Sequence, residues 1–458
     1  MEKISKIINE QKICSIIEKT SKPTPEIILN IIKKATQKRG LELEDIGYLL
    51  NTDDADLVGK IFQAAAQIKM EIYGERLVFF APLYVSSFCV NDCKYCGFHN
   101  SNPTKRKKLT LEEVEEQTKI LINMGHKRLL LEFGEDPQNT PIDYITDVIK
   151  TIYQTKTDKG EIRRLNVNIA ATNVEDYQKL KAANIGTYQL FQETYHKPTY
   201  EKLHSGPKAS FERQLLAHDN AFEAGIDDIG LGVLFGLYDY KFEVLSLISH
   251  AHYLEKKHQI GPHTFSVPRW QPAESVELDL PHYVSEDELL KIIAILRLAV
   301  PYTGMIISTR ESAETREKAF KIGISQTSAA SRTSPGGYGK EKNATQFSVA
   351  DNRQVDEVIN TVLNQGLLPS FCTACYRKGR TGKNFMDLAK PGKIHHLCRA
   401  NGLLTFKEYL EDFASEKNKK QGQKVIDQSL VNITDKDTLQ KTKQKLKEIE
   451  QGSRDIYF

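Results

Sequence analysis

Residues 77–97 read LVFFAPLYVSSFCVNDCKYCG, and this stretch decides how the rest of the chain is interpreted. An apolar run from Leu77 to Val85 is followed directly by three cysteines, Cys89, Cys93 and Cys96. A short apolar run bounded by polar residues is typical of a buried strand. The stretch therefore predicts a strand whose C-terminal end carries a group of thiols.

Short apolar runs continue to alternate with amphipathic helices as far as about residue 350. Capping boxes at Thr110 with Glu113, and at Ser285 with Glu288, mark two of the expected helix starts. Expected helix-to-strand junctions carry glycines at positions 125, 160, 186, 225, 261, 304 and 323. After the first strand, further strands are expected to begin near Lys127, Arg163, Thr187, Asp228, His263, Met305 and Ile324.

Eight strand-helix units favour a closed (β/α)₈ TIM-type barrel, an α/β fold. The same spacing is compatible with an open doubly wound sheet or a partly open barrel. We expect an N-terminal helical extension over residues 1–75, the barrel over 76–350, and a mostly helical C-terminal region over 351–458.

The amino-acid composition argues against several classes of function, including nucleic-acid binding and membrane insertion. The net charge of +3 arises from 63 basic and 60 acidic residues, a balance too even to predict nucleic-acid binding. No apolar run is long enough to predict a membrane span, and the first residues lack the pattern of a secretory signal, so we expect a cytoplasmic protein. Six of the seven cysteines fall into two groups, which favours metal binding over disulfides. Cys14 belongs to neither group and is expected to be a small apolar residue of an N-terminal helix.

The first group has the spacing C-x3-C-x2-C. Three thiolates are one short of the four ligands of a four-iron cluster, so one iron would remain open to another ligand. The alternative is a structural zinc site in which His99 joins the three cysteines.

The spacing of this group, Tyr95 before its last cysteine, and its position after the first strand resemble the radical S-adenosylmethionine (SAM) superfamily. The resemblance implies a [4Fe-4S] cluster whose open iron is chelated by SAM, and reductive cleavage of SAM to a 5′-deoxyadenosyl radical. SAM-binding residues implied by it are Tyr95, Gly134, Glu135, Asp136 and Glu193, with Asn168 and Thr172 as weaker candidates.

The second group, Cys372, Cys375 and Cys398, has the spacing C-x2-C-x22-C. It again offers three thiolates. One hypothesis is a zinc site completed by His395 or His396. The other is an auxiliary iron-sulfur cluster with an open site.

The two groups together resemble the HydG family of [FeFe]-hydrogenase maturases, which are tyrosine lyases. Stretches 191–196 (FQETYH), 232–240 (GVLFGLYDY) and 369–377 (PSFCTACYR) are similar to that family. The resemblance implies cleavage of the Cα–Cβ bond of L-tyrosine to p-cresol and dehydroglycine. Dehydroglycine then becomes carbon monoxide and cyanide at an auxiliary cluster that holds a dangling iron and free cysteine.

The resemblance also assigns roles to single residues. In the element 261–269 (GPHTFSVPR), His263 is expected to ligate the dangling iron. Arg310 is expected to bind the tyrosine carboxylate with help from Ser308 and Ser328, and Arg332 is a further candidate. His99-Asn100 departs from the more basic pair expected after the first group, which leaves the details of the SAM pocket open.

Implied partners are L-tyrosine, a reductant such as ferredoxin or flavodoxin, and a hydrogenase-maturation scaffold GTPase as recipient of the product. Two other functions remain open. A thiazole-pathway tyrosine lyase shares the radical chemistry but lacks an equivalent second cluster, and a non-catalytic iron-sulfur carrier would only store clusters.

The positions of the motifs on the strands predict where the two sites lie. The first cysteine group and Glu135 follow strands, so they belong at the C-terminal mouth of the barrel. His263 precedes the run Thr264 to Val267, which places it at the opposite mouth. We therefore expect the two sites to be separated by about the length of the strands, on the order of 20 Å.

Overall fold

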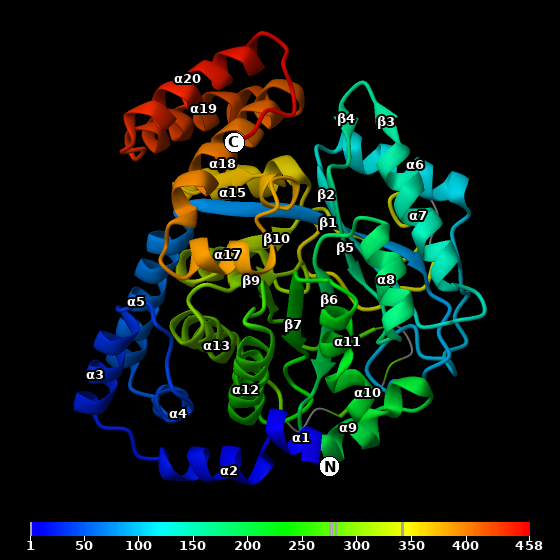
Figure 1. Ribbon diagram of the computed structural model, residues 1–458, viewed down its shortest axis with the longest axis vertical. Coiled ribbons are helices and arrows are strands. Elements are labelled where there is room, and N and C mark those ends of the chain that lie inside the picture. The colour runs from blue at the N-terminus through cyan, green and yellow to red at the C-terminus, as the bar shows by residue number, and fades with distance from the viewer. Residues whose placement is uncertain (1, 274–275, 277, 280–281, 340–342) are drawn as a thin grey trace.

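The computed structural model describes residues 2–273, 276, 278–279, 282–339 and 343–458. At its centre is a closed barrel of parallel strands, each of which neighbours the next barrel strand along the chain (Figure 1). The barrel strands are β1 (Arg76–Ser86), β2 (Arg128–Phe133), β5 (Arg164–Asn168), β6 (Tyr188–Glu193), β7 (Ile229–Val233), β8 (Thr264–Ser266), β9 (Gly304–Ile307) and β10 (Gln326–Ser328).

Closure comes from β1, whose 11 residues exceed the length of every other described strand. Its first half pairs with β10, with Val78 opposite Gln326, while its second half pairs with β2, with Ala81 opposite Leu129. The pairing of β1 with β10 confirms the predicted closed barrel and is incompatible with an open doubly wound sheet.

Helices cover the outside of the barrel, as expected from the right-handed crossover between parallel strands. Both predicted capping boxes are present, at Thr110 with Glu113 and at Ser285 with Glu288. The helices between β1 and β11 are α6 (Leu111–Asn123), α7 (Ile142–Gln154), α8 (Val174–Ala182), α9 (Lys197–Leu203), η1 (Pro207–Ala209), α10 (Phe211–Leu215), α11 (Ala217–Glu223), α12 (Tyr240–His258), α13 (Glu286–Ala299), α14 (Ala313–Ile322) and α15 (Val355–Asn364).

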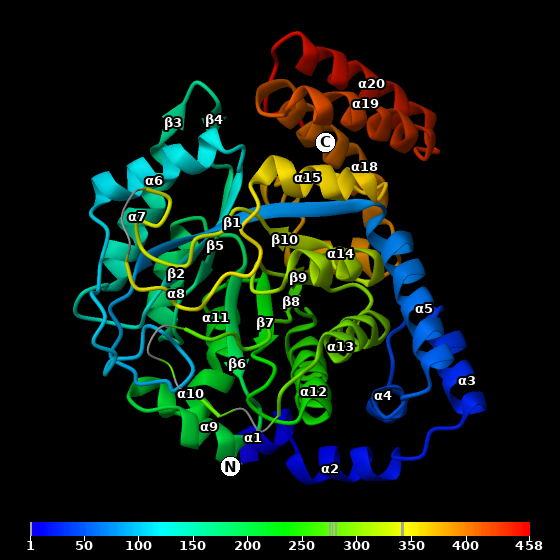
Figure 2. The ribbon, with the colours of Figure 1, turned by 180° about the vertical axis from the view of Figure 1, so that it is seen from behind.

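Helices before and after the barrel pack against its outer surface (Figures 1 and 2). The N-terminal helices are α1 (Glu2–Ile7), α2 (Glu10–Lys19), α3 (Pro25–Ala35), α4 (Leu43–Leu50) and α5 (Ala55–Tyr73), of which α5 packs on α13. The C-terminal elements are β11 (Leu368–Ser370), α16 (Ala374–Arg377), α17 (Gly382–Ala389), α18 (Ile394–Asp412), α19 (Glu416–Val431) and α20 (Lys436–Glu450). None of the described helices combines the length and apolar character that crossing a membrane requires.

The structure corrects several expectations about local elements. Strand β11 pairs with the start of β1, and β3 (Lys156–Thr157) forms a hairpin with β4 (Gly160–Glu161); neither feature was predicted. Gly160 lies in that hairpin and does not end a helix. At the end of α12 the left-handed position is taken by Gln259 and not by Gly261. Cys14 lies on the N-terminal helix α2, as expected, and its side chain is exposed.

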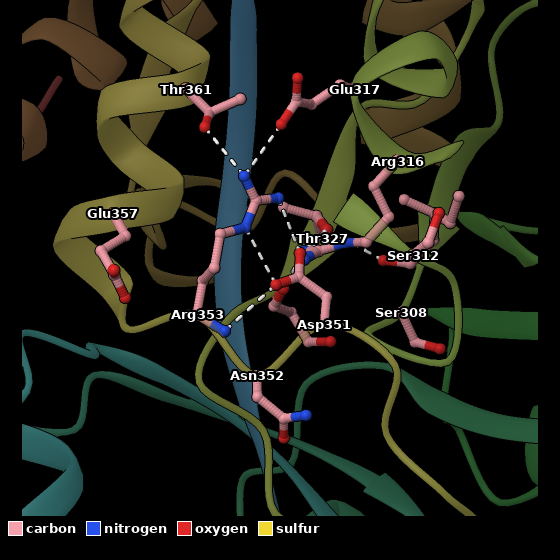
Figure 3. A network of polar contacts seen from close by, with 12 residues as sticks. Ser308, Ser312, Arg316, Glu317, Thr327, Asp351, Asn352, Arg353, Glu357 and Thr361 are labelled. Carbon is pink, nitrogen blue, oxygen red and sulfur yellow. Dashed lines mark hydrogen bonds and ion pairs between the residues drawn. The ribbon is translucent and has the colours of Figure 1, made fainter. Parts of the chain in front are cut away.

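A buried ion-pair network fixes the loop between β10 and α15 (Figure 3). Asp351 pairs with Arg316 and with Arg353, whose Nη2 lies 2.7 Å from its Oδ2. Arg316 also donates from Nη2 to the Thr327 hydroxyl at 2.8 Å, at the end of the barrel wall. Burial alone would raise the pKa of Asp351. The hydrogen bonds from Arg353 and the charge of Arg316 outweigh burial, so the pKa of this carboxyl lies below its ordinary value. The network therefore ties this loop to the barrel through a carboxylate that stays ionised.

Replacing Asp351 with Asn is expected to lower the free energy of unfolding by about 3 kcal/mol, because it leaves the buried Arg316 without its counterion. Both side chains are buried, with exposed fractions of 0% for Arg316 and 1% for Asp351. Denaturant titration of the cluster-free chain measures the change. Asp437→Asn is the matched control, since that carboxylate is 68% exposed and its loss should cost less than about 0.5 kcal/mol. Equal effects of the two substitutions would contradict this role for Asp351.

Candidate active site

A cavity inside the barrel opens at the C-terminal ends of its strands. Strand alternation directs every second side chain inward, so Leu130 and Glu132 of β2 both line it. The three cysteines of the first group line the same cavity, as do residues from the ends of most barrel strands. The lining residues that bear on its chemistry include Tyr84, Cys89, Cys93, Tyr95, Cys96, Glu132, Gly134, Glu135, Asn168, Glu193, Lys208, Ser308, Arg310, Ser328 and Phe347.

The loop that carries the first cysteine group is held in place by Arg106. Its Nη1 donates to the carbonyl oxygens of Ser87, at 2.7 Å, and Phe98, at 2.9 Å, on the two sides of the group. Its Nη2 donates to the carbonyl oxygens of His99 and Asn100. One guanidinium therefore joins the beginning and the end of the loop, which fixes the positions of the thiols between them.

The first group has the chemistry that an iron-sulfur cluster requires. Burial raises the pKa of the Cys93 thiol well above its ordinary value and raises that of Cys96 to about 11. Buried thiols of this kind become thiolates when a metal binds them, because the cation compensates their charge. The three residues fit a cluster with one open iron.

The histidines of the two zinc alternatives are placed as follows. His99 hydrogen-bonds through Nδ1 to Asp92 at 2.9 Å, and His395 through Nδ1 to the Gly392 carbonyl oxygen at 2.6 Å. Within the described residues, no three His, Cys, Asp or Glu side chains are grouped as ligands of one metal ion.

Two of the predicted SAM-binding carboxylates form ion pairs at the cavity wall. Glu135 accepts from Asn91 and from Arg213, both at 2.6 Å. Glu193 accepts from Lys208 at 2.7 Å. Its backbone has a φ of 68°, a left-handed conformation that costs energy in a residue other than glycine and is concentrated at functional sites.

The remaining predicted SAM-binding residues are placed as follows. Gly134 lines the cavity, and the Tyr95 hydroxyl hydrogen-bonds to His204 at 2.7 Å. Asp136 does not line the cavity, and its carboxylate accepts hydrogen bonds from the backbone of the following turn. Thr172 is also outside, where its hydroxyl donates to Asp176.

The residues predicted to bind tyrosine belong to the wall of the same cavity. Arg310, Ser308 and Ser328 all line it, and the guanidinium carbon of Arg310 lies 3.3 Å from the centre of the Phe347 ring. Among the described residues, the Ser328 hydroxyl has no hydrogen-bond partner. Arg332 does not line the cavity, and its guanidinium donates to the carbonyl oxygen of Ser331.

The second cysteine group lies in a separate pocket at the N-terminal ends of the strands. This pocket is lined by Arg76 and Arg128, the first residues of β1 and β2, together with His263, Cys372, Cys375 and Cys398. The C-terminal region supplies the cysteines: one follows β11, one is on α16 and one is on α18. Burial raises the pKa of Cys372, and raises that of Cys375 to about 12.

The imidazole of His263 is oriented by a neighbouring carboxylate. Its Nδ1 lies 3.0 Å from Asp228, which leaves Nε2 as the nitrogen for a metal. The ring also stacks on Phe385 with centroids 4.2 Å apart. The predicted partners of the second site are therefore brought together, and thiols with an oriented imidazole fit an iron-containing cluster.

The two pockets lie at opposite ends of the same strands. The 11 residues of β1 separate Arg76, in the second pocket, from the loop that carries the first cysteine group. At about 3.3 Å per residue, this strand spans roughly 33 Å. The two groups of thiols lie at opposite ends of the barrel, so direct contact between them is excluded.

Known proteins match this chain at the level of sequence and structure. Residues 83–248 match the family model of the radical SAM superfamily, and residues 266–368 match the biotin and thiamin synthesis associated domain. A 2-iminoacetate synthase from Salmonella typhimurium is 31% identical over 341 residues, which cover 74% of this chain and 89% of that protein.

Solved structures of HydG, a maturase of the [FeFe]-hydrogenase, match over almost the whole length. One is 54% identical, with a TM-score of 0.97 over 99% of this chain and 100% of that chain. HydG from Carboxydothermus hydrogenoformans is 40% identical, with a TM-score of 0.85 over 96% and 99% of the two chains. The chain therefore belongs to the radical SAM superfamily, and over almost its entire length it resembles the hydrogenase maturase HydG.

Proposed function

We propose that this protein is a radical SAM tyrosine lyase that cleaves L-tyrosine to p-cresol and dehydroglycine and converts the latter to carbon monoxide and cyanide. The observation that carries the proposal is the pair of thiol groups at opposite ends of one barrel. One group shares a cavity with Arg310, and the other shares a pocket with His263. Two separate sites suit two successive reactions on one carbon skeleton.

In the first site, Cys89, Cys93 and Cys96 would hold the [4Fe-4S] cluster that the superfamily implies. When bound, this cluster with SAM as its additional ligand supplies the 5′-deoxyadenosyl radical. Glu135 and Glu193 would receive the polar groups of SAM, and both are already aligned by ion pairs with Arg213 and Lys208.

The substrate would bind beside Arg310. Within the described residues its guanidinium has no carboxylate partner at ion-pair distance, although it lies inside the barrel. A planar guanidinium is suited to hold a carboxylate through two hydrogen bonds, and the hydroxyls of Ser308 and Ser328 would complete that contact. This binding mode fixes the amino acid while its Cα–Cβ bond breaks.

In the second site, Cys372, Cys375 and Cys398 would hold the auxiliary cluster, with His263 as ligand of the dangling iron that also carries free cysteine. The cluster supplies the metal to which the diatomic fragments attach. The chain's own contribution is to orient His263 through Asp228 and to close the pocket with Phe385. We further propose ferredoxin or flavodoxin as reductant and a scaffold GTPase as recipient.

The three segments would divide this work. Residues 76–350 would form the radical-generating barrel, residues 351–458 would cap it and supply the second group of cysteines, and residues 1–75 would support its outside. The curated relative named 2-iminoacetate synthase suggests the thiazole-pathway lyase as the second candidate. The second cysteine group argues against that candidate, because forming dehydroglycine alone leaves it without a role.

Anaerobic incubation of the reconstituted protein with SAM, dithionite and tyrosine tests the proposal. We expect 5′-deoxyadenosine and p-cresol, with p-cresol absent when tyrosine is omitted. A non-catalytic carrier yields neither product. Formation of 5′-deoxyadenosine without p-cresol, under conditions where tyrosine binds, would refute the tyrosine lyase while leaving the superfamily assignment intact.

A further inference from the structure

An acidic and a basic side chain, Glu132 and Arg310, face the same cavity without pairing. Each lines the cavity, and neither takes part in an ion pair within the described part of the chain. Opposite charges enclosed in one low-dielectric space normally form a salt bridge. Two that remain apart can instead bind the two ends of a zwitterion, such as the carboxylate and ammonium groups of an α-amino acid.

Glu132 is held in place by the strand next to its own. It lies directly opposite Asn168 in the parallel pairing of β2 with β5, and Asn168 Nδ2 donates to its Oε2 at 2.8 Å. Its other oxygen has no hydrogen bond within the described residues, although Glu132 lines the cavity. One oxygen is thus anchored, and the other is open to a ligand.

Arg310 is held in a complementary way. Its guanidinium is stacked on the Phe347 ring, so its face is covered while its N–H edge remains available for a ligand. The two groups come from different sides of the barrel, since Glu132 is on β2 and Arg310 follows β9.

The surroundings of Glu132 suit proton transfer as well as binding. Burial raises its pKa to about 8, a shift opposed by Arg310 and the Asn168 hydrogen bond and assisted by Glu193. Tyr84 on β1 is a further titratable neighbour, and it stays neutral because burial raises its pKa far above its ordinary value. The α-ammonium group of a free amino acid is somewhat less acidic than a polypeptide N-terminus, whose ordinary pKa is about 8, so its proton affinity is of similar size to that of Glu132.

We propose that Glu132 binds the ammonium group of the amino-acid substrate and accepts one proton from it, while Arg310 binds the carboxylate. The inference rests on the proposed function and adds a residue to it. One N–H bond of the ammonium breaks and one O–H bond forms on Glu132; the nitrogen keeps its electron pair, and nothing is oxidised or reduced. The products of this step are a neutral amine, which retains two N–H bonds, and a neutral carboxylic acid.

The proton affinities of Glu132 and of the substrate amine are of similar size, which makes this proton transfer accessible. A carboxyl group at its ordinary pKa of 4.5 would take the proton about 3,000-fold less favourably than one at about 8. The neutral amine is also the form from which a radical can remove hydrogen at nitrogen without first breaking an ion pair. Glu132 would therefore prepare the substrate before the radical is formed.

Binding of tyrosine to the reconstituted, SAM-loaded and unreduced protein tests the inference without turnover. Glu132 is protonated below about pH 8 in the free protein, so binding of the zwitterion must release its proton. The dissociation constant of tyrosine should fall about tenfold for each unit of pH from 6 to 8 and then level off. The analogue 3-(4-hydroxyphenyl)propanoate, which lacks the amino group, should not show this dependence.

The variant Glu132→Gln keeps the shape and the contact with Asn168 but cannot accept a proton. We expect it to lose the pH dependence, to bind tyrosine no more than about threefold better than the analogue, and to form p-cresol at least about 100-fold more slowly. Glu243→Gln is the matched control. That carboxyl is also buried, with a pKa raised by burial to about 8, but it accepts from Thr194 and Tyr195 and does not line the cavity.

The outcomes separate this inference from the proposed function. If wild-type protein cleaves tyrosine but its binding shows no pH dependence relative to the analogue, Glu132 has no such role, and this result needs no variant to fold. Wild-type behaviour of Glu132→Gln would also overturn the inference. Failure of the wild-type protein to bind or cleave tyrosine would instead refute the proposed function itself.

Discussion

A Cys93→Ala variant is expected to lose SAM cleavage completely, so that 5′-deoxyadenosine stays at background under strong reductant. Two thiolates cannot hold the cluster that three hold, and Cys93 is buried at the cavity wall, where no external ligand has ready access to replace it. Anaerobic reconstitution followed by electron paramagnetic resonance and product analysis measures both the cluster and its activity.

The matched control for this variant is Cys14→Ala. Cys14 is exposed on α2 and belongs to neither thiol group, so its removal should leave cluster content and SAM cleavage unchanged. Cys96→Ala should behave like Cys93→Ala. Sustained formation of 5′-deoxyadenosine by a Cys93→Ala protein shown to lack the cluster would contradict the assignment of the first site.

The second large effect is expected from Cys372→Ala, which should leave p-cresol formation largely intact while carbon monoxide release falls to background. The reason is spatial, since Cys372 lies in the pocket at the opposite end of the barrel from the first site. Removing it disrupts the second cluster without touching the groups that would bind SAM and tyrosine.

Cys398→Ala provides an independent check, because this residue reaches the same pocket from a different helix, α18. Both variants should give the same separation of p-cresol from carbon monoxide. If the two products fell together in both variants, one shared site would explain the chemistry better than two.

The architecture and both thiol sites were predictable because their signals are local or periodic. Alternating strands and helices indicated the barrel, and the position of His263 just before its strand placed it at the mouth opposite Cys89. Strand β11, Leu368–Ser370, was missed because it lies beyond about residue 350, where the alternation of apolar runs with helices ends, and it pairs with β1 outside the barrel order.

The polar residues around the first site were harder to predict. Lys208 and Arg213 sit in ordinary helical sequence, and what makes them part of the site is pairing with Glu193 and Glu135, 15 and 78 positions away. Glu132 lies in the apolar run of β2, where a single acid indicates burial but not what it faces. An acid after a strand also suits a turn, and the carboxylate of Asp136 accepts from the backbone of the turn that follows it.

The central claim is that one tyrosine molecule supplies products at both sites. The most direct measurement is anaerobic turnover of the reconstituted protein with SAM, dithionite and uniformly ¹³C-labelled tyrosine, with mass analysis of p-cresol, carbon monoxide and cyanide. The account predicts that all three products carry the label, with carbon monoxide and cyanide lost in Cys372→Ala while labelled p-cresol persists. Unlabelled carbon monoxide and cyanide, or release of labelled dehydroglycine without either diatomic, would contradict it.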